Sequence, residues 1–187
     1  MAGSHADAPR TSSRRLARRH HGFTVVELIL VIVLVGIISA VAMTRFFDRT
    51  VFDADAATEQ LRATLRYAQK IAIAQHRPVF VQLAPNRIAL CFRNEAVCAP
   101  ADQVVAPSGD NSGSAATLDA CGSRTWMCEG RPASITATAN IAVLGFDALG
   151  QPFNVPQTAA FGGLTVMIRG GAATRTVTVA AETGHVS

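Results

Sequence analysis

Hydrophobic and polar positions follow three successive patterns along the chain. An apolar run without a charge extends over 16 residues, from Leu28 to Met43. With residues 23–26 in front, it gives roughly 20 residues of helix, or about 30 Å, which is enough to cross a bilayer. A second pattern follows, in which small or apolar residues recur about every four positions, at Ala57, Leu61, Leu65, Ala68 and Ala72. This spacing predicts a helix with one buried stripe, lying against a sheet.

The third pattern begins after His76, where the period changes to that of β-strands. The segment RPVFVQLAPNRIALCFR places two strand-forming runs around Ala84, Pro85 and Asn86, a composition typical of a hairpin turn. Residues 133–153, 163–169 and 174–187 indicate further strands joined by turns that contain glycine. We therefore predict an α+β fold, in which a long N-terminal helix is followed by an antiparallel β-sheet.

A polar segment interrupts the strand pattern between Asn94 and Ser134. It is rich in glycine, proline and serine, so we expect a surface insertion without regular secondary structure. Loops of this length in a compact domain are usually functional or disordered. Two disulfides would favour an ordered insertion.

Charge separates the N-terminal leader from the rest of the chain. The net charge is +4, and residues 1–22 account for all of it, since they hold five arginines against Asp7 alone. We interpret these residues as an unstructured leader. Positive residues beside an apolar segment stay in the cytoplasm, so the C-terminal body should cross into the bacterial periplasm or leave the cell.

Four cysteines fit an oxidising compartment. They form two groups, and we favour the pairs Cys91 with Cys98 and Cys121 with Cys128 because each closes a short local loop. Four cysteines permit three connectivities, and a zinc site is the rival interpretation. Trp126, the only tryptophan, lies between two of these cysteines, either as packing within the loop, which we favour, or as an anchor for a partner.

Glu27 is an unexpected carboxylate near the start of the apolar run. Moving it toward hydrocarbon costs on the order of 2 to 3 kcal/mol unless a cation pairs with it. If the chain were cut between Gly22 and Phe23, the new α-amino group of Phe23 would supply that cation. In a bundle of staggered helices, the Phe23 amine of one subunit would meet Glu27 of its neighbour.

The stretch GFTVVELILVIVLVGIISAVA resembles the class III signal of type IV prepilins and type II secretion pseudopilins. The resemblance implies that a prepilin peptidase cuts after Gly22 and methylates the amine of Phe23. It also implies that Glu27 guides docking into the growing filament. An ordinary signal-anchor helix with a stray acid is the alternative.

The body resembles the GspH/FimT pilin domain in LRYAQKIAIAQHRPV, FDALGQP and TVTVAAETGHV. TRFFDRTVFDADAATEQLRATLRYAQKIAIAQ and WMCEGRP are most similar to the minor pilin of mannose-sensitive haemagglutinin (MSHA) type pili. The resemblance implies a cleaved leader (1–22), a transmembrane and filament-core helix (23–47) and a periplasmic pilin domain (48–187). The expected partners are other pilins, the prepilin peptidase and the inner-membrane assembly platform, with no cofactor.

The resemblance implies a minor pilin or pseudopilin that primes or caps a pilus or pseudopilus. It acts by packing, because the sequence has no nucleophile and base motif and its histidines are scattered. A pseudopilin that couples to secreted proteins is a further alternative.

DNA capture is the main alternative, since FimT-like relatives carry a C-terminal Gly-Arg-x-Arg. This chain instead ends in Gly184, His185, Val186 and Ser187. Both arginines are missing and the body is neutral, which leaves His185, Arg169 and Arg175 as DNA-contact candidates. We expect Arg62, Arg66 and Lys70 to form a solvated helix face.

Overall fold

The computed structural model describes residues 23–46 and 49–187, with side chains for 23–40 and 49–187. Our predictions for the leader, including Gly22, lie outside these residues. The chain divides into two units, Met1–Phe47 and Asp48–Ser187, and each is described by itself.

The first unit contains one helix, α1 (Val25–Phe46), where the apolar run predicts it. No charged residue follows Glu27 as far as Ala40, and the side chains from Phe23 to Ala40 are exposed. Among the residues whose side chains the structure describes, no helix is both long and apolar enough to cross a membrane.

The second unit is organised around helix α2 (Arg49–Gln75). The predicted stripe of Ala57, Leu61, Leu65, Ala68 and Ala72 is buried, as expected. Two threonines on the buried side, Thr58 and Thr64, donate hydrogen bonds from their hydroxyls to the carbonyls of Ala54 and Gln60, at 2.7 and 2.8 Å. These bonds satisfy the hydroxyl groups within the helix, so the face can enter an apolar core.

Helix α2 ends at a left-handed residue, His76 (φ 50°). The N–H of His76 donates to Ile73 and the N–H of Arg77 donates to Ala72, so two carbonyls of the last turn are satisfied. This arrangement is a Schellman motif, with histidine in the position usually taken by glycine. It turns the chain into the first strand.

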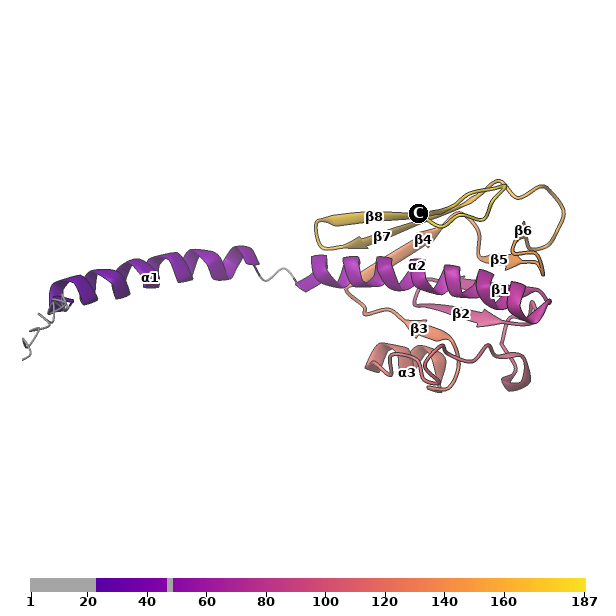
Figure 1. The fold of residues 1–187 in the computed structure, drawn as a ribbon, viewed down its shortest axis with the longest axis horizontal. Helices are drawn as coiled ribbons and strands as arrows, with labels where there is room; N and C mark the ends of the chain where they lie inside the picture. The colour runs from indigo at the N-terminus through magenta and orange to yellow at the C-terminus, as the bar shows by residue number, and fades with distance from the viewer. Residues whose placement is uncertain (1–22, 47–48) are drawn as a thin grey trace, which may run out of the picture. The chain divides into compact units, whose positions relative to one another are not determined.

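Two antiparallel sheets pack against α2 (Figure 1). The first has the order β3-β2-β1-β5-β6 and consists of β1 (Val79–Ala84), β2 (Arg87–Cys91), β3 (Cys128–Gly130), β5 (Val143–Phe146) and β6 (Pro152–Asn154). The second has the order β4-β7-β8 and consists of β4 (Ile135–Ala139), β7 (Leu164–Gly170) and β8 (Ala173–Val179). The predicted hairpin is confirmed, since Ala84 pairs with Arg87 across the turn.

The strand pattern predicts one antiparallel sheet, whereas the structure has two. The chain leaves β4 and enters β5, which pairs with β1, whereas β7 returns to pair with β4. Because α2 contacts strands of both sheets, one core serves both. Its largest fully buried side chains include Phe146, Leu61, Leu65, Leu90, Leu144 and Leu164.

The prediction that residues 94–134 lack regular structure is wrong. They contain a 3₁₀ turn (Pro100–Asp102), helix α3 (Ala115–Cys121) and strand β3, which joins the first sheet. Composition missed these elements because α3 and β3 are short and polar and are stabilised by tertiary contacts. We call residues 92–131 the disulfide lobe.

Replacing Leu65 with alanine should lower the free energy of unfolding of the unit Asp48–Ser187 by about 2–5 kcal/mol, because a fully buried leucine leaves a cavity. Urea denaturation followed by circular dichroism measures the loss. The control is Lys70→Ala on the exposed face of the same helix, which should change the value by about 0.5 kcal/mol or less. Equal effects of the two substitutions would contradict the assigned orientation of α2.

Candidate functional site

Two residues of the predicted processing and assembly site lie at the start of α1, with Phe23 two residues before the helix and Glu27 in its first turn. The Thr24 hydroxyl accepts a hydrogen bond from the Glu27 N–H at 3.2 Å, and the Thr24 carbonyl accepts one from Leu28 at 3.1 Å. Thr24 therefore begins the helix as its N-cap, with Glu27 three residues later, the spacing of a capping box. Negative charge is favourable at this end of a helix, so the acid has a local role besides any role between subunits.

The side chains that follow Glu27 expose a continuous apolar surface. Phe23 is 77% exposed, and leucine, isoleucine and valine side chains between Val25 and Ile38 are each 44–74% exposed. Surfaces of this size on a soluble protein mark contact with a partner or a membrane. The turn that carries Glu27 therefore begins a surface that is suited to burial.

The two disulfides join the pairs that we predict, Cys91 with Cys98 and Cys121 with Cys128. No cysteine of the described residues is free, and the bonded sulfurs replace the zinc-thiolate interpretation. Four residues, Cys91, Cys98, Cys128 and Ala89, form a second small core together with Trp126. This core stabilises the disulfide lobe on the side of β2 opposite the main core.

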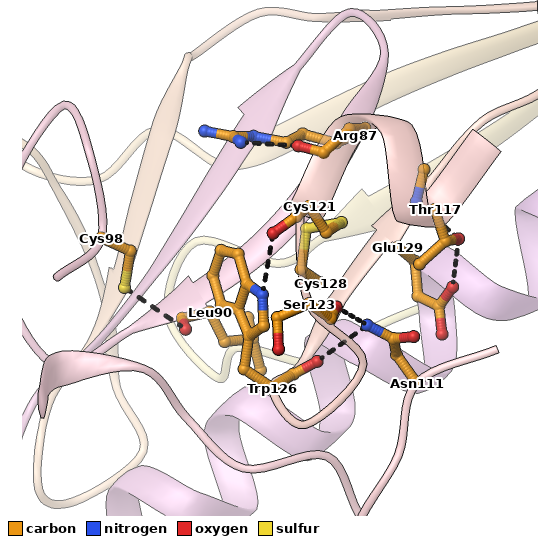
Figure 2. The surroundings of a disulfide bond; sticks show 12 residues. Arg87, Leu90, Cys98, Asn111, Thr117, Cys121, Ser123, Trp126, Cys128 and Glu129 are labelled. Carbon is orange, nitrogen blue, oxygen red and sulfur yellow. Dashed lines mark hydrogen bonds between the residues drawn. A yellow bond between two sulfur atoms is a disulfide. The ribbon is translucent and has the colours of Figure 1, made fainter. Parts of the chain in front are cut away.

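Trp126 packs inside the disulfide lobe and is only 4% exposed. Its indole N–H donates to the Cys121 carbonyl at 3.2 Å, as Figure 2 shows. The interpretation that Trp126 packs within the loop is therefore correct, and the alternative that it is an exposed anchor for a partner is wrong.

Glu129 is a buried carboxylate of the disulfide lobe that our sequence analysis missed. It is 5% exposed and accepts hydrogen bonds from the Ser112 N–H at 2.8 Å, the Ser112 hydroxyl at 2.5 Å and the Thr117 hydroxyl at 2.9 Å. Three donors from the segment before β3 thus converge on one side chain of β3 (Figure 2 shows Thr117 and Glu129). The carboxylate orders α3 and its approach, because a buried charge is costly without such bonds.

Close packing of α3 on β3 also requires Gly130. A Cβ atom at this position would overlap the Ala116 carbonyl oxygen, so no larger residue fits without displacing the backbone. The Gly130 N–H donates to the Thr117 hydroxyl at 3.0 Å. The glycine therefore allows helix and strand to share this hydrogen bond.

Arg131 connects the disulfide lobe to the β1–β2 turn. Its guanidinium is buried and donates to the carbonyls of Ala84 at 2.7 Å and Pro85 at 3.2 Å. Burial lowers the pKa of Arg131 from its usual value. On the other side of the disulfide lobe, the Tyr67 hydroxyl of α2 donates to Val105 at 2.9 Å, and burial raises its pKa. The disulfide lobe is therefore fixed at two separate points.

The three candidate DNA contacts do not form one surface. Arg175 pairs with Ile168 across the ladder and Arg169 pairs with Thr174, so the two arginines lie on opposite faces of the second sheet. The Arg175 Nε atom also lies 2.6 Å from the Asp55 carboxylate, which offsets its charge. His185 lies in the C-terminal tail, where Val186 bridges to Val179. Arg66 and Lys70 are exposed, in agreement with a solvated face, and Arg62 is half-buried and pairs with Glu59.

Two family models match the chain. The prokaryotic N-terminal methylation motif matches residues 17–43, which include Gly22, Phe23 and Glu27. The model of type II transport protein GspH matches residues 57–184, about two thirds of the chain. The chain belongs to the GspH family. It is a pilin or pseudopilin of that family, and such proteins are structural rather than enzymatic.

Solved structures add a likeness to the type IV minor pilin FimU of Pseudomonas aeruginosa. One crystal form has 17% identity and a TM-score of 0.47, over 71% of this chain and 90% of that one. A second has 18% identity and a TM-score of 0.48, over 71% and 85%. No curated protein matches the chain. The methylation motif indicates that this GspH-family protein is membrane-anchored and processed.

Replacing Cys121 and Cys128 together with alanine should destabilise the unit Asp48–Ser187 by about 2–3 kcal/mol, the value expected for a short disulfide loop. Because Trp126 is the only tryptophan and lies in the second core, its fluorescence emission should shift to longer wavelength. Denaturant titrations with both readouts test this. The control is Leu118→Ala, at an exposed position of α3, and equal spectra and stabilities for the two variants would contradict the role of the disulfide.

Proposed function

We propose that this GspH-family protein is a minor subunit that primes or caps assembly of a type IV pilus of the MSHA type or of a type II secretion pseudopilus. The single observation that carries the proposal is the match of the methylation motif to residues 17–43, which include Phe23 just before α1 and Glu27 in its first turn. The GspH domain supports the choice of pilin class. The resemblance of TRFFDRTVFDADAATEQLRATLRYAQKIAIAQ and WMCEGRP to MSHA minor pilins supports the finer assignment.

Processing comes first in the proposed sequence of events. The prepilin peptidase cuts after Gly22 and methylates the new amine of Phe23. Before this cut, the arginines of residues 1–22 keep that end in the cytoplasm, and the helix over residues 23–47 anchors the protein in the inner membrane. The body then lies in the periplasm, where an oxidising environment permits both disulfides.

Assembly follows through the exposed surface of α1. The apolar side chains after Glu27 leave lipid and enter the filament core, where they pack against the same segment of other pilins. The Glu27 carboxylate meets the amine of Phe23 on a neighbouring subunit. Both charges are costly in an apolar environment when alone, so this pairing selects the correct stagger between subunits.

The inner-membrane assembly platform receives the subunit. Because the body of the subunit is neutral, it adds no long-range electrostatic attraction. The other expected partners are pilins, the prepilin peptidase and the membrane itself. We expect no nucleic-acid partner, since Arg169 and Arg175 lie on opposite faces of the second sheet. In this account the body takes part through its shape and its contacts.

Glu27→Ala should reduce incorporation of the subunit into filaments at least about tenfold, equivalent to about 1.4 kcal/mol of lost pairing. Immunoblots of sheared filaments, normalised to the membrane pool, measure incorporation. Glu59→Ala is the matched control, since this acid lies on the exposed side of α2 and pairs only locally with Arg62. Glu27→Gln separates charge from helix capping, because glutamine also fits the third position of a capping box but carries no charge. Unchanged incorporation of Glu27→Ala would contradict the docking role.

A further inference from the structure

Strand β4 is an edge strand of the second sheet whose free side opens into a recess. Its sequence is ITATA, and β7 pairs with it on one side, whereas no strand of the described residues pairs with it on the other. The adjoining cavity of about 510 Å³ is lined by all five β4 residues. The remaining lining residues are Leu83 and Pro85 near the β1–β2 turn, and Ile141 and Ala142 in the β4–β5 connection.

A hydrogen bond of Asn140, the residue that follows β4, indicates which backbone groups of β4 are free. The N–H of Asn140 donates to the Thr165 carbonyl of β7 at 3.1 Å, so Asn140 points its backbone toward β7. Backbone groups alternate in direction along a strand, and therefore Thr138 and Thr136 also point toward β7. The N–H and C=O groups of Ala137 and Ala139 point the opposite way, into the recess.

Other sheet edges of the described chain are partly protected. At the C-terminal end of β8, Thr178 and Ser187 exchange backbone hydrogen bonds at 3.0 and 3.1 Å, so the last residues cover that part of the edge. At β3, the Gly130 N–H is bonded to Thr117, and β6 begins with Pro152, which has no N–H. Natural proteins protect exposed edges with charges, prolines or short length, and β4 has neither charge nor proline over five residues.

We propose that β4 accepts one extended, uncharged strand from another protein, which adds to the second sheet in the recess. Backbone groups of Ala137 and Ala139 would bond to the incoming strand, and its inward side chains would contact Leu83 and Ile141. The recess contains no charged lining residue, which favours uncharged side chains. Arg131 supports the β1–β2 turn beside the recess, because it holds the carbonyls of Ala84 and Pro85.

A second copy of this chain is a poorer occupant than a separate strand. The β4 edge of the second copy lies in the same kind of recess, behind its own β1–β2 turn. Two recessed edges would bring their flanking turns into contact before their backbones could pair. A single extended segment, such as a terminus or a protruding loop of a partner, has no such obstruction.

The test uses the full-length protein in detergent and a capped, fluorescein-labelled peptide of sequence LTVMI. This sequence belongs to β7, which β4 already accepts on its other side. Anisotropy titrations should show saturable binding that Ala137→Pro weakens at least tenfold, since the substitution removes one free N–H. Thr176→Val, at an exposed position of β8 outside the recess, should remain within twofold of the wild type.

Hydrogen exchange of the wild-type protein provides a second measurement that does not depend on folding of the proline variant. Without peptide, the amides of Ala137 and Ala139 should exchange at least 100-fold faster than those of Thr136 and Thr138. Saturating peptide should protect Ala137 and Ala139. Absence of binding, or protection elsewhere, would overturn the proposal. Protection of these amides by dimerisation without peptide would also overturn it, in favour of a second copy.

Discussion

Burial of one face of α2 is the interaction on which the rest of the body depends. Its stripe from Ala54 to Ala72 contacts strands of both sheets, so neither sheet has an apolar core without the helix. Alanines along this stripe let the sheets approach closely, and Leu61 and Leu65 fill the space between them. Residues far apart in sequence, such as Leu90 and Val177, thereby share one core. The hydrophobic effect of this shared core fixes the positions of the β1–β2 turn, the disulfide lobe and the free edge of β4.

Strand β2 connects the main core to the second core beneath the disulfide lobe. Ile88 and Leu90 face α2, whereas Ala89 and Cys91 belong to the second core with Trp126. A strand buried on both sides needs a cover, and the disulfide lobe provides it. Two disulfides, the Glu129 carboxylate and Arg131 then restrict this lobe more tightly than its small apolar core could alone. The exposed apolar surface of α1 belongs to the separate N-terminal unit.

Local patterns predicted much of this structure because they express local physics. The period of the α2 stripe, the hairpin at Pro85 and both disulfide loops depend on residues close in sequence, and all three are confirmed. The division into two sheets depends on which distant strands pair, and strand propensity contains no such information. Glu129 and Arg131 were missed because their partners, Ser112, Thr117 and Ala84, converge only after folding. The unbroken apolar run of β2 did contain a usable signal, since burial of both faces required a cover such as the disulfide lobe.

Processing at Phe23 is the central claim of the functional account, because the amine that pairs with Glu27 exists only after cleavage. Intact mass and N-terminal sequencing of the protein from membranes, with and without the prepilin peptidase, test it most directly. The account predicts a peptidase-dependent N-terminus at methylated Phe23. An intact leader, or a cut at another position, would contradict it, since the protein would then be a plain membrane-anchored domain.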